Sequence, residues 1–310
     1  MALSSLNSLD AARLRTQFES AEPFRYFVVE RFLDPAFCDS LAAEFPSFDE
    51  RQATNELGVS GGKAVRPDLA AIGPAYRRLD DLLRSSEFLS FLSAATGIPK
   101  LLYDPEYVGG GTHENRHGQE LDTHVDFNYH PRTRLHRRLN LILFLNPEWS
   151  PEWGGLLELQ RNPAGADNLV QTVEPLLNRC VLFETTENSW HGFRRIVLPE
   201  DKRHLSRRSI AVYFYTKERP REEAAPSHGT VYVQRPPPAF LQPGYTLQPE
   251  DVHELQIQFA RRDTHIRYLY ERELEFSRVA QSPAFRIARA LTWPLRKLRD
   301  GMRGDGSSAK

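Results

Sequence analysis

The chain contains few cysteines and no long run of apolar residues. Cys38 and Cys180 are its only cysteines, too few for a disulfide framework and unsuitably spaced for a cysteine-based zinc site. This usage indicates a reducing compartment. No stretch of about 18 apolar residues is present, which argues against a membrane-spanning helix. The first residues lack a basic segment followed by an apolar core, so we predict a cytoplasmic protein.

Neither sign of charge is in excess. Forty Lys and Arg residues against 41 Asp and Glu residues give a formal net charge of −1, which provides no reason to expect nucleic acid as a partner. The composition, 40% hydrophobic and 26% charged, is that of an ordinary soluble globular protein. A length of 310 residues accommodates one sizeable domain with additions.

The pattern of apolar residues changes near Pro99. Before it, helical periodicity is found at 9–18, 35–45, 76–83 and 88–96, with a strand at 24–29 and an irregular, glycine-containing loop at 51–65. After it, short strand-like runs follow one another at 101–108, 120–127, 139–146, 155–160, 179–184, 190–197 and 207–216. This succession predicts a β-sandwich or barrel with the helices packed on one sheet.

Three regions are expected along the chain. Residues 1–220 form the main domain, with a β core at about 100–217 and helical support at 1–99, and 221–249 form a proline-rich linker. Residues 250–310 form a helical, basic tail whose long helix carries one apolar stripe: Val252, Leu255, Phe259, Ile266, Leu269 and Phe276. The basic segment from 285 to 303 could contact an anionic membrane surface, although a solvated chain end is the commoner explanation. The oligomeric state is not predicted.

Three residues suggest a metal site. His124 and Asp126 stand two apart on a predicted strand, so both side chains point to one face. His191, after several further strands, offers a third ligand. Two histidines and one carboxylate with open positions are typical of non-haem Fe(II) oxygenases. The alternative is a non-catalytic barrel in which the His–Asp pair is only a hydrogen-bonded core contact.

A second motif points to different chemistry. His113-Glu114-Asn115-Arg116-His117 matches the His-Glu-x-x-His signature of zinc proteases, which requires a helix. Three glycines precede the motif and Gly118 follows it, so a helix is disfavoured and a loop or hairpin at the pocket mouth is expected. The basic cluster 132–138 is expected to be a solvated loop.

The ordered segments after Asp104 resemble the 2-oxoglutarate- and Fe(II)-dependent oxygenases, specifically the bacterial prolyl 4-hydroxylase-like group. The resemblance is carried by Gly109-Gly110-Gly111-Thr112-His113, His124-Val125-Asp126-Phe127-Asn128, Arg137 to Asn146, Trp153 to Leu159, Trp190-His191-Gly192 and Arg207 to Thr216. It implies a mainly β fold with flanking helices: a double-stranded β-helix (jelly-roll or cupin-like) core, a helical layer on one sheet and a helical C-terminal extension.

The resemblance also implies the site. Fe(II) would be held by His124, Asp126 and His191, with 2-oxoglutarate as co-substrate, O2 as oxidant and ascorbate as a candidate reductant. The far carboxylate of 2-oxoglutarate would pair with Arg207, or with Arg208 as second choice. Relatives often have Tyr at the position of Phe144, and Asn140 is expected to substitute for its contact. The candidate substrate-pocket residues are His113, Asn128, Tyr107 and Trp190.

The implied activity is hydroxylation of an organic substrate, by default a prolyl or other peptidyl side chain. Two alternatives stay open. The segments 266–274, 281–287 and 294–296 look like the ends of some bacterial glycosyltransferases and surface-polysaccharide proteins, which suggests a glycan or glycolipid substrate. The other alternative is a scaffold or binding protein that retained the barrel without turnover.

Overall fold

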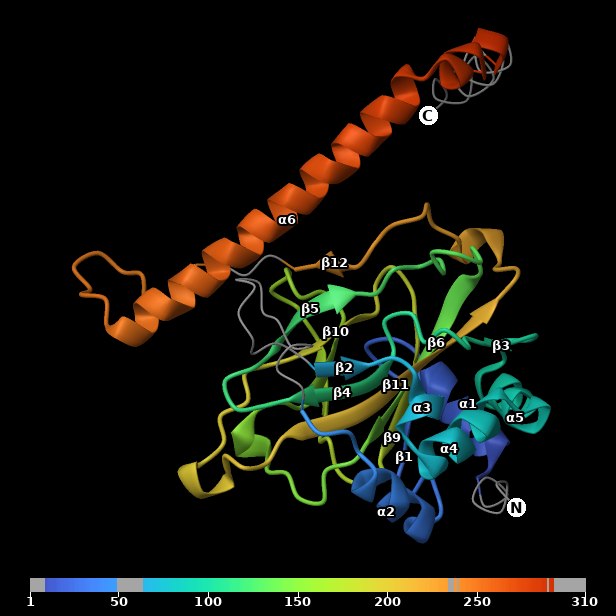
Figure 1. Ribbon diagram of the computed structural model, residues 1–310, viewed down its shortest axis with the longest axis vertical. Coiled ribbons are helices and arrows are strands. Elements are labelled where there is room, and N and C mark those ends of the chain that lie inside the picture. The colour runs from blue at the N-terminus through green and yellow to red at the C-terminus, as the bar shows by residue number, and fades with distance from the viewer. Residues whose placement is uncertain (1–8, 49–63, 234–236, 239, 289, 293–310) are drawn as a thin grey trace. The chain divides into compact units, whose positions relative to one another are not determined.

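The computed structural model describes residues 9–48, 64–233, 237–238, 240–288 and 290–292 (Figure 1). The chain divides into two units, residues 1–236 and 237–310. The first unit contains the strands β1 to β12 and the helices α1 to α5 of the described residues, and the second contains the long helix α6 (Pro249–Gln281). In the part of the chain that the structure covers, no helix has the length and apolar character needed to cross a membrane.

The helices of the first unit begin at residues suited to capping. Asp10 accepts hydrogen bonds from the backbone N–H groups of Ala12 and Arg13, and Asp34 caps the next helix just before Pro35. The last helix of this layer ends at Gly97, whose φ of 72° provides the left-handed C-cap. The helices are α1 (Ala11–Ser20), α2 (Pro35–Ala43), α3 (Leu69–Ile72), α4 (Pro74–Arg84) and α5 (Ser86–Thr96).

The strands form two antiparallel sheets. The seven-stranded sheet has the order β1-β9-β6-β11-β4-β2, with β3 also paired to β11, and the five-stranded sheet has the order β12-β5-β10-β7-β8. The strands are β1 (Tyr26–Val29), β2 (Ala64–Arg66), β3 (Leu102–Tyr103), β4 (Gly111–Asn115), β5 (Leu121–Val125), β6 (His136–Phe144), β7 (Leu157–Gln160), β8 (Val170–Val173), β9 (Cys180–Glu184), β10 (Trp190–Phe193), β11 (Arg207–Thr216) and β12 (Val231–Tyr232).

Two apolar layers lie on opposite faces of the seven-stranded sheet. Alternate residues of β11, such as Ile210 and Phe214, join the core under helices α1 to α5. The opposite face, with Phe144 and Phe183, packs against Leu159 of the five-stranded sheet. The space between the two sheets is therefore a packed interior that side chains from both sheets enter. The predicted fold, a double-stranded β-helix with a helical layer on one sheet, is confirmed.

Several elements differ from the sequence prediction. β2, β4, β8 and β12 were not expected. β2 and β12 are only three and two residues long and pair with strands distant in sequence, β4 is polar (Gly-Thr-His-Glu-Asn), and β8 is a four-residue strand that pairs with the neighbouring β7. β4 occupies the place of the predicted hairpin around His113. Residues 51–63 of the predicted loop 51–65 lie outside the described residues, and its last two residues belong to β2. Within the stretch predicted as a linker, β12 pairs with β5, so this part belongs to the five-stranded sheet.

Candidate active site

His124, Asp126 and His191 converge in the interior between the sheets. His124 lies on β5 directly opposite His191 on β10, and Asp126 follows the end of β5. The Nε2 atom of His124 is 3.8 Å from Oδ1 of Asp126, and Nε2 of His191 is 3.7 Å from Oδ2. One ligand atom from each of the three residues lies within 4.8 Å of the others. All three side chains are at least nine-tenths buried, so the group has the size and the seclusion of a metal site.

Backbone contacts set the tautomer of both imidazoles. Nδ1 of His124 lies 2.7 Å from the carbonyl oxygen of Asp122, and Nδ1 of His191 lies 2.9 Å from that of Ser189. A carbonyl oxygen can only accept a hydrogen bond, so each Nδ1 is the protonated nitrogen. The lone pair of each Nε2 is then directed to the site, as required of a neutral imidazole that binds a metal.

The carboxylate of Asp126 is held by a buried arginine and an amide. Nη1 of Arg137 is 2.8 Å from Oδ2 of Asp126, and Nδ2 of Asn140 donates to the same oxygen at 3.3 Å. The Arg137 guanidinium lies between the rings of Phe127 and Tyr213, 3.6 and 3.7 Å from their centroids. Burial alone would raise the pKa of Asp126, but Arg137 and the two imidazoles hold it well below its ordinary value. Asp126 is therefore an anion with a fixed orientation.

The buried position of Arg137 corrects the prediction for the cluster 132–138. The side chain of Arg137 has no exposed surface, and that of Arg138 is 5% exposed, so these two residues do not belong to a solvated loop. Arg138 pairs instead with Glu184 and Glu223. Asn140, which was predicted to contact 2-oxoglutarate, donates a hydrogen bond to the carboxylate of Asp126. Its contact with the co-substrate stays a prediction.

Replacing Arg137 by methionine is expected to lower Fe(II) affinity about 10–100-fold, the usual cost of losing a group that orients a ligand. Loss of the positive guanidinium would by itself raise the affinity for Fe(II). The carboxylate of Asp126, however, would lose its fixed orientation, because only the hydrogen bond from Asn140 would remain of the two contacts that hold it. Anaerobic Fe(II) titration measures the effect. Arg138→Met is the control, because it removes a neighbouring buried arginine that does not contact Asp126. Equal affinities for the Arg137 variant and the unmodified protein would contradict this role.

Arg207 is a buried cation without a carboxylate partner among the described residues. Its Nε donates to the carbonyl oxygen of Gly155 at 2.6 Å, and its guanidinium carbon lies 4.2 Å from the ring centroid of Phe193 and 5.1 Å from that of Phe144. Burial lowers the pKa of Arg207 to about 9, because no anion compensates the desolvated charge. Phe193 stands two residues after His191 on β10. The site therefore offers an anion position in the same interior as the triad.

The neighbouring Arg208 faces the other side of the sheet. Its Nε is 3.4 Å from Oε1 of Glu114, and its guanidinium lies over the ring of Phe45 after helix α2. Successive residues of a strand point to opposite faces, so Arg207 and Arg208 cannot serve the same site. The placement favours Arg207 over Arg208 as the arginine for the co-substrate. Phe144, at the position where relatives often have Tyr, is fully buried beside Arg207.

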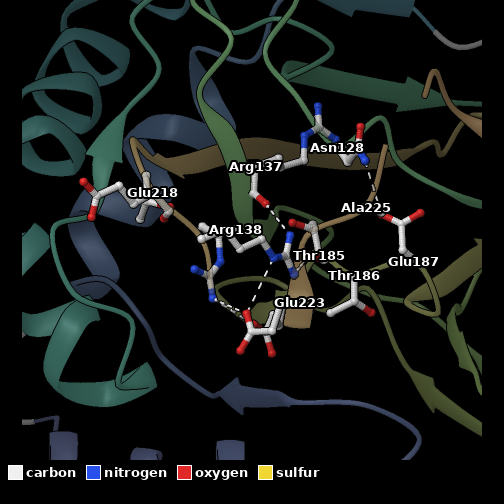
Figure 2. Close-up of polar contacts among 12 residues, drawn as sticks. Asn128, Arg137, Arg138, Thr185, Thr186, Glu187, Glu218, Glu223 and Ala225 are labelled. Carbon is white, nitrogen blue, oxygen red and sulfur yellow. Dashed lines mark hydrogen bonds and ion pairs between the residues drawn. The ribbon is translucent and has the colours of Figure 1, made fainter. Parts of the chain in front are cut away.

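A segment that follows β11 crosses back to the triad. We call residues 217–233 the strap. Arg138 donates to Oε2 of Glu223 at 3.0 Å (Figure 2). The side chain of Asn128 donates to the carbonyl oxygen of Pro226 and accepts from the backbone N–H of His228. At its end, β12 pairs with β5, and the ring of Tyr232 lies 5.3 Å from that of His124. The strap thus closes the edge of the five-stranded sheet next to a triad histidine.

Asn128→Ala is expected to loosen the strap, since it removes both hydrogen bonds that hold residues 226 and 228. The loss of a buried anchor of this kind costs about 1–3 kcal/mol. Hydrogen–deuterium exchange of peptides that cover 223–233 should become faster. Asn168→Ala is a matched control, because that side chain also makes two hydrogen bonds in a loop before β8. Unchanged exchange of the strap in Asn128→Ala would contradict its role.

The other predicted pocket residues have separate places. Asn128 holds the strap, and Tyr107 lies in the core under the helices, where its hydroxyl bonds Asp80, on the face of the seven-stranded sheet opposite to the triad. Trp190 precedes His191 on β10 and so points to the other face of that strand. His113 is buried on β4 opposite Ser209, on the interior face. Of the four, His113 alone is placed toward the interior by its strand.

The protease interpretation of the second motif is excluded. His113 and Glu114 belong to strand β4, so their side chains point to opposite faces, and Nδ1 of His117 accepts a hydrogen bond from the backbone N–H of Leu198. Among the described residues, the other group that could hold an ion is Asp104, Glu106 and His130. There, Nδ1 of His130 accepts backbone hydrogen bonds, so Nε2 carries the proton and has no lone pair for a metal.

The match to a protein family agrees with this geometry. Residues 110–215 match the sequence model described as the 2OG-Fe(II) oxygenase superfamily. It covers about a third of the chain and includes all three residues of the triad and Arg207. The predicted resemblance is thereby confirmed. The cofactors of the superfamily are Fe(II), 2-oxoglutarate and O2. A search of curated proteins finds no match.

Several solved structures of low sequence identity are similar to this chain. A prolyl hydroxylase from Trichoplax adhaerens, in complex with a hypoxia inducible factor peptide fragment, is 16% identical and has a TM-score of 0.47, over 67% of this chain and 91% of that one. A prolyl-4-hydroxylase from Pseudomonas putida is 18% identical, with a TM-score of 0.42, over 66% and 98%. HygX from Streptomyces hygroscopicus with nickel, 2-oxoglutarate and hygromycin B is 16% identical, with a TM-score of 0.42, over 67% and 92%.

The residues present fit the cofactors of this superfamily. The two Nε2 atoms and the Asp126 carboxylate are nitrogen and oxygen donors of the kind that non-haem Fe(II) takes. The guanidinium of Arg207 is desolvated, and a bound anion would offset the energetic cost of its buried charge. Its planar geometry suits a carboxylate, which can accept two parallel hydrogen bonds from it. The donor set of the triad therefore fits Fe(II), and Arg207 supplies a buried cation on the same side of the seven-stranded sheet.

Proposed function

We propose that the chain hydroxylates an unactivated C–H bond of an organic substrate, and that the substrate is a prolyl or other peptidyl side chain. The observation that carries the proposal is the presence, in one interior, of three convergent ligand groups and a buried arginine that has no carboxylate partner among the described residues. A hydrogen-bonded core contact would explain His124 and Asp126 but gives no reason for a third ligand or for Arg207. The likeness of residues 110–215 to oxygenases supports the same activity.

The roles of the residues follow from their positions. His124, Asp126 and His191 hold the metal, Arg137 and Asn140 keep the carboxylate of Asp126 oriented, and Arg207 pairs with the far carboxylate of 2-oxoglutarate. Fe(II), 2-oxoglutarate and O2 together supply the oxidising chemistry that converts C–H to C–OH, with succinate and CO2 as co-products. The apolar side chains between the sheets exclude water from this chemistry. Ascorbate as reductant and a cytoplasmic location stay predictions.

Substrate libraries test the proposal. Anaerobic addition of Fe(II) and 2-oxoglutarate should produce a visible charge-transfer band, and admission of air with proline-containing peptides should yield succinate and a peptide that has gained one oxygen atom. Product formation from oligosaccharides or glycolipids alone would favour the glycan alternative. Absence of both the band and succinate would leave the non-catalytic scaffold. Arg208→Ala, altered on the opposite face of β11, is the matched control that should retain activity.

A further inference from the structure

The second unit presents an apolar stripe along one helix. Helix α6 has 33 residues, which correspond to about 50 Å at a rise of about 1.5 Å per residue. It begins with a capping box in which Asp251 accepts from the backbone N–H of Gln248, so its start is fixed locally. The exposed fractions of Phe259, Ile266 and Phe276 are 58%, 48% and 69%. Such large exposed side chains in register indicate a surface that another element covers.

The stripe follows a repeat of seven residues. In a heptad written from a to g, the a positions are Val252, Phe259, Ile266, Glu273 and Ala280, and the d positions are Leu255, Arg262, Leu269 and Phe276. An α-helix lying on a globular core follows its 3.6-residue period, and its stripe drifts relative to a strict heptad. A heptad maintained over this length is typical of a helix that pairs with another helix in a coiled coil.

Two charged residues interrupt the stripe, and they restrict the orientation of the pairing. Arg262 occupies a d position and Glu273 an a position. In a parallel pair of identical helices, each core residue faces its own copy, so two arginines would meet in one layer and two glutamates in another. Like charges at such positions are destabilising. A parallel pair is therefore disfavoured.

In an antiparallel pair, a single register places both charged core residues opposite a residue of the other sign. In this arrangement a positions lie opposite d positions. If Ile266 faces Leu269 of the partner subunit, Arg262 faces Glu273 of the partner subunit, and the same register sets Phe259 against Phe276 of the partner subunit. Leu255 then faces Ala280 of the partner subunit. Every charged core position obtains an opposite charge, and the apolar positions meet one another.

We propose that α6 is a dimerisation helix that pairs antiparallel with α6 of a second copy of this chain. The occupant is argued from the charge complementarity of Arg262 and Glu273 and from the heptad repeat. The proposal concerns the second unit alone and does not depend on the oxygenase activity. The partner of the helical tail is thus the same helix in a second copy of the chain.

Charge reversal tests the pairing on the full chain. Analytical ultracentrifugation should show a dimer, and Arg262→Glu or Glu273→Arg alone should raise the dimer Kd at least about tenfold, the equivalent of about 1.4 kcal/mol. The double variant should return the Kd to near its original value, because the opposed charges are exchanged. Arg267→Glu makes the same charge change at a b position, outside the stripe, and should leave the Kd unchanged. A monomer at all concentrations, or no recovery in the double variant, would overturn the proposal.

Cysteine cross-linking tests the orientation. Both native cysteines are buried, which limits their interference. Leu255→Cys and Ala280→Cys variants should each fail to form a disulfide-linked dimer alone and should form one when mixed. A parallel pair would cross-link in the Leu255→Cys variant by itself, and this would overturn the antiparallel register. A monomer in which α6 is protected from hydrogen exchange would show that the stripe packs on its own chain instead.

Discussion

Replacing Asp126 by alanine is expected to abolish Fe(II) binding and, with it, the anaerobic charge-transfer band and all 2-oxoglutarate turnover. The change removes the one carboxylate of the triad, and two imidazoles on neighbouring strands do not suffice to hold the ion. It also leaves the guanidinium of Arg137 buried without a counter-charge, which costs about 3–5 kcal/mol of stability. The variant should therefore lose both metal and thermal stability.

A double variant separates these two effects. Asp126→Ala combined with Arg137→Met removes the orphaned charge, so it should recover much of the thermal stability and still bind no iron. Glu106→Gln serves as the control for the second carboxylate–histidine group, and its iron content should stay unchanged. Iron analysis after desalting, together with thermal unfolding, measures the outcome. Iron retained by Asp126→Ala would show that the ligands are not these three residues.

Replacing Arg207 by methionine should weaken 2-oxoglutarate binding by about 30-fold to several thousandfold, corresponding to about 2–5 kcal/mol for one partner of a buried charge pair. Iron binding should persist, because Arg207 does not contact the triad carboxylate. The apo-protein should become more stable at the same time. Burial lowers the pKa of Arg207 since its charge is uncompensated, and methionine removes that unfavourable charge while keeping a similar volume.

A higher stability of the Arg207→Met apo-protein together with a loss of stabilisation by 2-oxoglutarate is the result expected only if Arg207 binds an anion. In the unmodified protein, 2-oxoglutarate with Fe(II) should raise the unfolding temperature by mass action, and in Arg207→Met this increase should disappear. Arg208→Met, altered on the helix-facing side and paired with Glu114, should keep both the affinity and the temperature increase. Equal losses from the two variants would reverse the assignment of the arginine.

The triad could be predicted because the spacing of its residues is a property of local strand geometry. His124 and Asp126 need only the two-residue repeat of a strand to share a face, and His191 needed only a strand partner for β5. The choice of Arg207 over Arg208 came instead from the resemblance to the oxygenase family, and its contact with 2-oxoglutarate stays a prediction. The fold class was accessible too, since the succession of short runs after Pro99 has few other solutions.

Arg137 could not be found by the same reasoning. On β6, Leu139 and Leu141 face the helices. Because side chains of a strand alternate between its two faces, Arg137 would be expected on the helix-facing side as well. A register shift between Phe214 and Tyr215 of β11 interrupts the alternation, and the guanidinium lies at Asp126 instead. A cluster of arginines is usually solvated, so the composition of this segment also predicted, wrongly, that Arg137 is exposed. The strap was equally hidden, because its contacts join residues about a hundred positions apart in the chain.

The pairing of β12 with β5 has a consequence for where the chain can be shortened. The strand that carries His124 would become the rim of its sheet if everything after residue 216 were removed, and its backbone N–H and C=O groups on that side would lose their partners. Unprotected rims of this kind recruit strands from other molecules and promote aggregation. A catalytic fragment that stays monodisperse should therefore extend at least through residue 233.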